Sequence, residues 1–263
     1  MSRLGGVAVI TGGASGIGAA CGRVLRDRGA TVVVLDRDIA RARQVAAEIG
    51  GHAVAGDVGE SDAIEAAAET IERTHGPVEM LVNSAGVIQR PVRPDDLPMS
   101  VWDDVVRIDQ RGTYVACLAF GRRMAQRRRG AIVNIASIAG MRSMPLHAYS
   151  PAKAAVISIT ENLAAEWGRA GVRVNCVSPG YTRTPALQAA IDRGERDVSS
   201  LVNLSALGRM VEPDDIARAV AFLCSTEAGA ITGVNLPVDC GWLVAPSWLT
   251  YGGLPTHGNG GPA

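Results

Sequence analysis

The sequence predicts an α/β fold in which a doubly wound parallel sheet forms a single domain. Short apolar segments rich in β-branched residues alternate along the chain with longer helical patterns. The apolar segments lack the polar alternation of a half-exposed strand, which is typical of parallel strands covered by helices on both faces. The regular succession of strand and helix in turn indicates βαβ units.

The expected elements follow one another without interruption. The strands are 7–11, 31–36, 53–57, 80–83, 131–136, 173–178 and 235–238. The helices lie near 16–28, 39–49, 61–75, 100–128, 150–169 and 212–225. No linker, repeat or low-complexity run divides them, so residues 1–242 are predicted to form one domain. Residues 243–263, rich in glycine and proline, are predicted to form a C-terminal tail.

Composition and charge exclude several classes of protein. Hydrophobic residues make up 47% of the 263 residues, enough for a sizeable core. The 26 basic residues are balanced by 26 acidic ones, unlike the basic surplus of a nucleic-acid-binding protein. No apolar stretch has membrane-spanning length, and the apolar run that starts at Val7 leaves no room for a signal peptide. We therefore expect a cytoplasmic protein that binds neither nucleic acid nor membrane.

Cysteines and histidines give no sign of a metal site. The five cysteines are odd in number, have no C-x-x-C spacing and lie in apolar segments, so we expect buried, reduced thiols. The four histidines are scattered. An arginine-rich run at 122–129 ends a predicted helix, where cations interact favourably with the helix dipole. A solvated helix end is therefore preferred to a partner-binding patch.

A glycine-rich turn, Thr11-Gly-Gly-Ala-Ser-Gly-Ile-Gly18, follows the first strand and opens the first helix. Its glycines allow the backbone to turn sharply and to approach a pyrophosphate at the helix N-terminus. The spacing G-x-x-x-G-x-G differs from the usual dinucleotide fingerprint, but its place between strand and helix favours a Rossmann fold. The cofactor-binding residues expected here are Gly12, Ser15, Gly16, Ile17 and Gly18.

Acidic, polar and small residues also close the next three strands. Asp36 ends the second strand, where a carboxylate accepts hydrogen bonds from the adenosine ribose and repels a 2′-phosphate. Arg37 keeps NADP as an alternative, but Ser15 is neutral where a basic residue would help, so NAD is favoured. Asp57 and Asn83-Ser-Ala-Gly86, which includes Ala85, lie where ligands bind in such sheets, although turn chemistry alone accounts for such residues as well.

The stretch Tyr149-Ser-Pro-Ala-Lys153 holds the only lysine among the 26 basic residues. An ammonium is a compact point charge that can release its proton, whereas arginine keeps its proton at any accessible pH. On a helix Tyr149 and Lys153 share a face, and the ammonium is expected to lower the tyrosine pKa from about 10 toward the working range. Ser137 follows the fifth strand and can converge on the phenol. The plainer alternatives are a helix-surface lysine and a loop-capping serine.

Together these motifs resemble the short-chain dehydrogenase/reductase family of NAD(P)-dependent oxidoreductases, over residues 5 to about 242. The resemblance implies that Tyr149 is the general acid/base and that Ser137 holds the substrate oxygen. It implies that Lys153 binds the nicotinamide ribose and lowers the tyrosine pKa. The family commonly forms tetramers, so a homotetramer is expected. The further cofactor-binding positions that the resemblance implies are Val58, Pro179, Gly180, Thr182 and Thr184.

Three residues depart from the family pattern. Asp109 occupies the position of an asparagine in the family's proton relay. We expect the relay to tolerate a carboxylate at this position. Ser84 replaces a commoner asparagine. Cys240 stands where glycine is usual after the last strand.

Substrate specificity in this fold lies in loops, here 89–99, 141–147 and 181–207. Their polar residues, such as Gln89, are expected to be mostly loop surface. The mixture suits a small polyol or sugar-type secondary alcohol. The alternatives are a 3-oxoacyl-carrier-protein reductase that docks its carrier on the arginines at 122–129, and a non-catalytic NAD-binding sensor.

Overall fold

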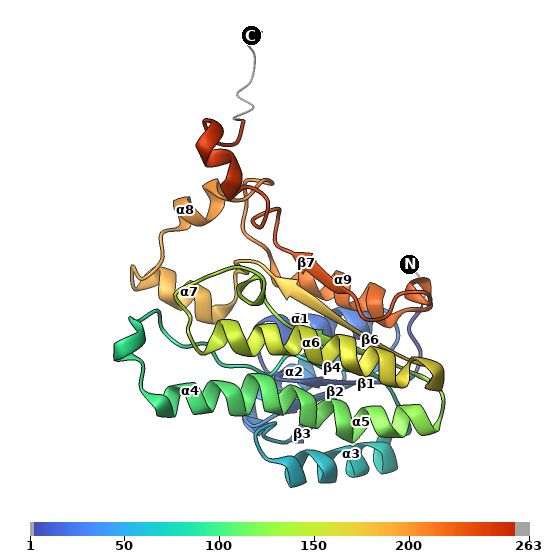
Figure 1. Cartoon of the computed structure of the whole chain (residues 1–263). Coiled ribbons are helices and arrows are strands. Elements are labelled where there is room, and N and C mark those ends of the chain that lie inside the picture. Colours follow the sequence, from blue (N-terminus) through green and yellow to red (C-terminus); the bar gives the residue numbers. More distant parts are fainter. Residues whose placement is uncertain (1–2, 256–263) are drawn as a thin grey trace.

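The computed structural model describes residues 3–255 and contains a parallel sheet with the strand order β3-β2-β1-β4-β5-β6-β7 (Figure 1). The chain winds outward in one direction from β1 to β3 and in the other from β4 to β7, which confirms the doubly wound α/β fold. The strands are β1 Val7–Thr11, β2 Thr31–Asp36, β3 His52–Ala55, β4 Val78–Asn83, β5 Gly130–Ile135, β6 Val172–Pro179 and β7 Asn235–Val238.

Helices cover both faces of this sheet. One apolar core lies under α1, α2 and α9, and a second lies under α3, α5 and α6. In β1, Ala8 and Ile10 belong to the first core and Val7 and Val9 to the second. The strand is therefore apolar throughout because successive side chains enter different cores. The helices are α1 Gly16–Asp27, α2 Ile39–Ile49, α3 Ser61–His75, α4 Met99–Val105, α5 Thr113–Gln126, α6 Tyr149–Trp167, α7 Pro185–Asp192, α8 Val198–Asn203 and α9 Pro213–Cys224.

Two expected elements are wrong in detail. The third strand, expected to reach residue 57, ends at Ala55, because Asp57 Oδ1 accepts the backbone N–H of Gly59 at 2.8 Å in a turn. The single helix expected near 100–128 is divided into α4 and α5 by a π-helical segment, Val106–Gly112. Within it, the carbonyl of Asp109 accepts a hydrogen bond from the Thr113 hydroxyl at 2.7 Å. Such π-helical turns occur frequently at functional sites.

The segment 181–207, expected to be a loop, contains α7 and α8. Both helices begin with capping signals in the sequence. The Thr184 hydroxyl accepts the N–H of Leu187 at 3.2 Å, and Pro185 occupies the first turn of α7. Asp197 accepts backbone N–H groups at the start of α8. Side-chain caps of this kind predict helix starts even where the helix is short and poorly buried.

The predicted tail at 243–263 includes a 3₁₀ helix, Pro246–Tyr251, and its last residues, 256–263, lie outside the described residues. Figure 1 shows this helix (red) projecting on the same side of the sheet as α7 and α8. Trp248, Leu249 and Tyr251 are 50%, 62% and 88% exposed.

The five cysteines are free and buried, as expected. Among residues 3–255, no helix combines the length and apolar character needed to cross a membrane. The same residues contain no cluster of three or more histidine, cysteine or acidic side chains that could hold a metal ion.

Helices α5 and α6 pack closely at Gly121. A Cβ atom on Gly121 would overlap Cζ3 and Cη2 of the Trp167 ring. A glycine inside a helix is less stable than alanine by roughly 0.5–1 kcal/mol, so the glycine needs a packing reason. The indole ring of Trp167, which belongs to the second core, supplies that reason.

We expect Gly121→Ala to lower the free energy of unfolding by about 1–3 kcal/mol, because overpacking outweighs the gain in helix propensity. Gly168→Ala is the matched control. Gly168 has helical backbone angles (φ −56°, ψ −46°) at the end of α6, and a Cβ there meets nothing within 4 Å. The control should be neutral or up to about 1 kcal/mol more stable. Urea unfolding measures both, and equal stability of the two variants would contradict the packing account.

Candidate active site

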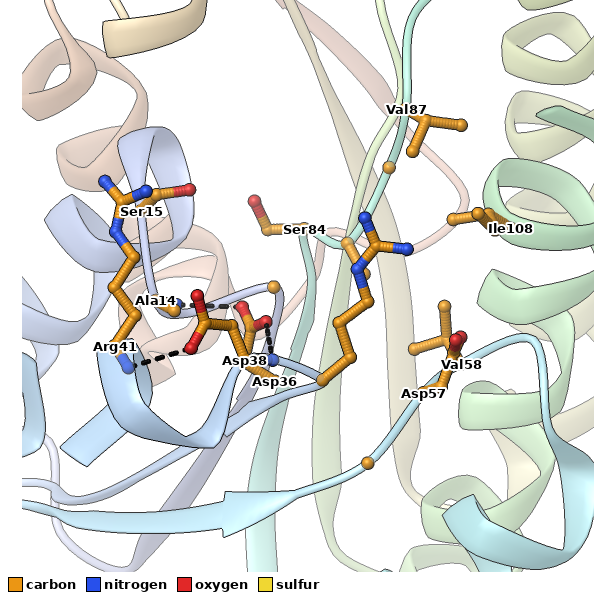
Figure 2. A pocket seen from close by; sticks show the side chains of 15 residues that line it. Ala14, Ser15, Asp36, Asp38, Arg41, Asp57, Val58, Ser84, Val87 and Ile108 are labelled. Atoms are coloured by element: carbon orange, nitrogen blue, oxygen red, sulfur yellow. Dashed lines mark hydrogen bonds between the residues drawn. The ribbon is translucent and has the colours of Figure 1, made fainter. Parts of the chain in front are cut away.

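The candidate site is a cleft at the carboxyl edge of the sheet, where β1 and β4 lie side by side and the direction of winding reverses. Segments that follow β1, β2, β3 and β4 line it (Figure 2). The structure therefore brings together expected cofactor residues from four separate strands. Those that line the cleft are Gly12, Ser15, Asp36, Asp57, Val58, Ala85 and Gly86.

The glycine-rich turn after β1 packs so closely against other backbone that Gly12 and Gly18 leave no space for a side chain. A Cβ on Gly12 would lie 2.5 Å from Ala85 Cα, and a Cβ on Gly18 would overlap the carbonyl oxygen of Gly12. Across the turn, a Cβ on Gly16 would lie 3.4 Å from Cγ2 of Thr184. The turn is thus held closely between the loop after β4 and the segment after β6. A cradle of bare backbone fits the pyrophosphate of a dinucleotide.

Helix α1 starts directly behind this turn. Its N-cap residue, Ser15, is extended and forms no side-chain hydrogen bond to the first turn within the described chain. The first turn of α1 carries no acidic side chain. Its leading N–H groups, together with the positive end of the helix dipole, can therefore receive an anion such as a phosphate.

Asp36 is fixed at the rim of the cleft. Its Oδ2 accepts the backbone N–H of Ala14 at 3.1 Å, and its Oδ1 accepts that of Asp38 at 3.0 Å. Each carboxylate oxygen retains a further lone pair for a ligand hydroxyl. Arg37 and Arg41 also line this part of the cleft, so cations lie within reach of the same region. Figure 2 shows Asp36 and Asp38 between the Ser15 side of the cleft and the Val58 side.

Asn83 lies beneath the cleft rather than in its lining. It is 2% exposed, and its amide nitrogen donates to Asn134 Oδ1 at 2.9 Å. The Thr11 hydroxyl contacts Asn83 Oδ1 at 3.4 Å and also accepts the N–H of Ala85. Asn83 therefore couples β1, β4 and β5 under the loop that carries Ala85 and Gly86.

Tyr149 and Lys153 lie one helical turn apart at the start of α6. The Lys153 ammonium is 5.4 Å from the centre of the Tyr149 ring, and it donates to the carbonyl of Ile135, at the end of β5, at 3.1 Å. Ser137 follows β5 closely, and its Oγ accepts the N–H of Ala139 at 3.1 Å. The Lys153 side chain is only 5% exposed, so this lysine is not a helix-surface cation.

Asp109 pairs with this lysine. Its Oδ2 lies 3.1 Å from Lys153 Nζ, and its side chain is fully buried. Its Oδ1 accepts the N–H of Val87 at 2.8 Å, which ties the loop after β4 to the π-helical segment. A buried charge is strongly unfavourable unless it is compensated, and Asp109 stabilises the ammonium form of Lys153.

The pKa of Tyr149 is raised above its usual value, which corrects the sequence-based expectation of a lowered value. Burial is the largest cause, and the carboxylate of Asp109 adds to it. The ammonium of Lys153 and a hydrogen bond with Ser137 act in the opposite direction without prevailing. Burial likewise lowers the pKa of Lys153, but Asp109 and Tyr149 outweigh it and the net shift is upward. Lys153 therefore remains an ammonium at neutral pH.

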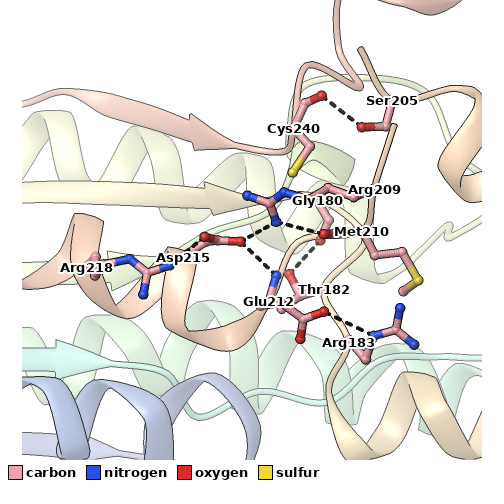
Figure 3. Close-up of polar contacts among 10 residues, drawn as sticks. All are labelled: Gly180, Thr182, Arg183, Ser205, Arg209, Met210, Glu212, Asp215, Arg218 and Cys240. Carbon is pink, nitrogen blue, oxygen red and sulfur yellow. Dashed lines mark hydrogen bonds and ion pairs between the residues drawn. The ribbon is translucent and has the colours of Figure 1, made fainter. Parts of the chain in front are cut away.

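The expected cofactor residues after β6 lie outside the lining of this cleft, in a segment held by its own hydrogen bonds. The N–H of Val211 donates to the Tyr181 carbonyl at 3.0 Å, and the N–H of Arg183 donates to the Val211 carbonyl at 2.8 Å. The Thr182 hydroxyl donates to the carbonyl of Gly180 at 2.9 Å. Residues 180–184, which follow Pro179 at the end of β6, are thus joined side by side to residues 210–212 (Figure 3).

The carboxylate of Asp215 holds residues 209–212 in place. Asp215 receives hydrogen bonds from Arg209 and Arg218, both at 2.7 Å, and from the backbone N–H of Glu212 at 3.0 Å (Figure 3). The hydrogen bond from Arg209 is the main reason that the pKa of Asp215 is lowered to about 2. Nearby, Cys240 has a φ of 54°, in the left-handed region that favours the glycine usual at this position. Its carbonyl accepts the Ser205 hydroxyl at 2.9 Å.

The arginine-rich end of α5 is engaged within the molecule. Arg127 forms two hydrogen bonds to Glu72, at 3.0 and 2.7 Å. Arg123 pairs with Glu65 at 2.7 Å and Arg129 with Glu79 at 2.9 Å. These contacts agree with the interpretation of this run as a helix end rather than a partner-binding patch.

The burial of Gln89 was not predictable from the sequence. Expected on a loop surface, this residue is only 5% exposed, and its Oε1 accepts the N–H groups of Ala148 at 2.5 Å and Tyr149 at 3.2 Å. Its neighbours Ile88 and Arg90 are exposed, so no apolar periodicity marks the position.

Comparison with known proteins agrees with this geometry. The model of the family described as enoyl-(acyl carrier protein) reductase matches residues 12–243. The D-threitol dehydrogenase of Mycolicibacterium smegmatis is 38% identical over 246 residues, which cover 91% of this chain and 94% of the relative. The galactitol 2-dehydrogenase of Rhizobium johnstonii is 38% identical over 242 residues, covering 89% and 94% of the two chains.

Solved structures share the fold. A crystal structure described as ribose-5-phosphate isomerase from Brucella melitensis 16M is 55% identical and superposes with a TM-score of 0.95, covering 97% of this chain and 99% of the other. The structure of gox2181 is 32% identical, with a TM-score of 0.89 and coverage of 92% and 97%.

Proposed function

Because the chain belongs to the short-chain dehydrogenase/reductase family, we propose that it is an NAD-dependent oxidoreductase of secondary alcohols and ketones. We propose a small polyol or sugar-type substrate, Ser137, Tyr149, Lys153 and Asp109 as the catalytic group, and the cytoplasm as its location. The dehydrogenases of D-threitol and galactitol among its relatives support the substrate class.

The buried ammonium of Lys153 next to Tyr149 is the observation that carries the proposal. The Lys153 side chain is almost fully buried, and it contacts the Asp109 carboxylate, the Ile135 carbonyl and the Tyr149 ring. A titratable cluster of this kind, beside a cradle that fits a dinucleotide, is typical of an active site.

Each residue then has a defined task. When bound, NAD⁺ supplies the acceptor for the hydride of the carbinol carbon, and NADH supplies the donor in the reverse direction. The Tyr149 oxygen takes up the hydroxyl proton during oxidation and returns it during reduction. Ser137 orients the reacting oxygen, and the Lys153 ammonium stabilises the phenolate. Asp109 and the Ile135 carbonyl hold the ammonium in place.

Three rival functions have weaker support. A carrier-protein reductase would need a free basic dock, but Arg123, Arg127 and Arg129 are paired with glutamates. A non-catalytic sensor has no need of a buried lysine beside a tyrosine. An isomerase, the activity by which one structural relative is described, would interconvert two sugars without net reduction of a cofactor.

The test is a screen of polyols, sugars and hydroxy acids with NAD⁺, followed by NADH absorbance and identification of the product. Tyr149→Phe serves as the catalytic control. Ribose 5-phosphate without cofactor is included as the isomerase arm. Cofactor-dependent turnover of a polyol that Tyr149→Phe abolishes supports the proposal. Conversion of ribose 5-phosphate to a ketose without cofactor would instead show that the protein is an isomerase.

We predict a preference for NAD over NADP, because the Asp36 carboxylate at the cleft rim accepts ribose hydroxyls and repels a 2′-phosphate. Asp36→Ala should narrow the ratio of kcat/KM for the two cofactors by at least about tenfold, which corresponds to about 1.4 kcal/mol. Comparable kcat/KM values for NAD and NADP in the wild-type enzyme would refute this assignment.

Lys153→Arg should lower kcat/KM by at least about a hundredfold, roughly 2.7 kcal/mol of transition-state stabilisation. The planar guanidinium is too wide for the point-charge site between Asp109 and Ile135, and it cannot pass on a proton. The melting temperature is measured in parallel, to separate loss of activity from loss of fold. A folded variant with near-normal turnover would show that Lys153 has no catalytic role.

Asp109→Asn should keep the maximal kcat/KM within about tenfold of wild type, or about 1.4 kcal/mol. Alcohol oxidation needs the phenolate, so its rate rises with pH through the tyrosine pKa. The carboxylate of Asp109 raises that pKa, and its removal should move the rising limb to lower pH. The pH profile of kcat/KM measures the shift. A far larger loss of activity, or a shift to higher pH, would mean that the negative charge itself is required.

We propose a homotetramer in which the 3₁₀ helix of the tail packs against a neighbouring subunit. Its exposed apolar side chains, Trp248, Leu249 and Tyr251, support this proposal, since such groups are seldom left in solvent together. Changing all three to serine should reduce the mass measured by light scattering or raise KM. Unchanged mass and unchanged kinetics would contradict the proposal.

A further inference from the structure

Gln89 places an amide group at the N-terminus of the helix that carries Tyr149. Helix α6 begins at Tyr149, and its N-cap residue is Ala148, which has no side-chain acceptor. The N–H groups of Ala148 and Tyr149 are among those that a helix cannot satisfy internally. Gln89 Oε1 accepts both, at 2.5 and 3.2 Å, from a segment about 60 positions earlier in the sequence.

The backbone around Gln89 is fixed from the other side. The N–H of Val87 is held by Asp109 at 2.8 Å, and Asp109 pairs with Lys153. Residues 87–89 therefore connect the ion pair at the second turn of α6 with the cap at its start. The place of the Tyr149 backbone depends on both contacts, and the position of its phenol follows from that backbone.

The other end of the amide is unused. Because two N–H donors converge on one atom of the amide, that atom must be the oxygen, and the nitrogen is turned away from them. Gln89 Nε2 is buried and makes no hydrogen bond to any residue of the described chain. Buried donors are normally paired, so an unpaired one beside a candidate acid/base calls for an external acceptor.

We propose that Gln89 is both a positioning residue for Tyr149, through its carbonyl oxygen, and a specificity-determining residue, through its amide nitrogen. The nitrogen donates to a hydroxyl oxygen of the substrate on a carbon next to the one that is oxidised. This part rests on the proposed polyol oxidation. The carbonyl oxygen accounts for the burial of an amide at this position, and the substrate contact gives its nitrogen a partner.

Two substitutions separate the roles. Gln89→Glu keeps an oxygen acceptor for both N–H groups, where a negative charge is favourable at a helix N-terminus, but loses the donor at neutral pH. Gln89→Met keeps the approximate length and loses both functions. Gln126→Glu and Gln126→Met, at the exposed end of α5, serve as matched controls.

The first measurement is hydrogen exchange of the amides of residues 148–150, which needs no substrate. Gln89→Met should speed exchange by at least about tenfold, whereas Gln89→Glu and both controls should leave it near wild type. Unchanged exchange in Gln89→Met would overturn the positioning role. This result is independent of whether the enzyme oxidises polyols.

The second measurement is the ratio of kcat/KM for a polyol substrate to that for its deoxy analogue, which lacks the hydroxyl beside the reacting carbon. The new charge in Gln89→Glu acts on both substrates alike, so the ratio isolates the lost hydrogen bond. We expect the ratio to fall by at least about tenfold in both Gln89 variants. An unchanged ratio would overturn the specificity role. If the wild-type enzyme oxidises no polyol, the proposed function fails and the specificity role fails with it, while the exchange result still decides the positioning role.

Discussion

The contact between the Lys153 ammonium and the Asp109 side-chain oxygen, which an asparagine oxygen can also make, joins the segments of the site. Both side chains are buried, so the further hydrogen bonds, to the Ile135 carbonyl and from the Val87 N–H, help to stabilise the pair. Those bonds reach the end of β5 and the loop after β4. A Cβ on Gly86 would already crowd Asp109 Oδ2 at 3.1 Å. The π-helical segment, α6, the end of β5 and the loop after β4 are thereby joined. The position of the Tyr149 phenol depends on this arrangement.

Much of the fold was predictable because it follows from local rules. A strand apolar throughout means two covered faces, and β1 shows this, with Ala8 and Ile10 in one core and Val7 and Val9 in the other. Turn residues at the strand ends predicted the place of the cleft, because the carboxyl ends of parallel strands share one edge. The capping residues Thr184 and Asp197 also mark the starts of α7 and α8, but these helices are too short for their apolar pattern to distinguish them from loop.

The rest depended on contacts between residues remote in sequence. The pairing of Asp109 with Lys153 depends on how the π-helical segment meets α6, and the burial of Gln89 depends on the path of the loop after β4. No periodicity in the sequence encodes either contact. The net shift of the Tyr149 pKa also depends on contacts between residues remote in sequence. The spacing from Lys153 suggests a lowered pKa, but the net direction is set by how far the surrounding protein removes water from the phenol.

The π-helical turn at Val106–Gly112 has a consequence for the register of the long helix that contains it. Each residue of an α-helix turns the following chain by about 100°, so the wider turn fixes which face of α5 meets α6. Asp109, inside this turn, must face Lys153, and Gly121, after it, must face Trp167. A deletion of one residue between them would rotate one contact away from its partner, whatever residue is removed. The two contacts therefore depend on the same helical register. To introduce the Asp109–Lys153 pair into a related protein, the π-helical turn and Gly121 have to be introduced as well.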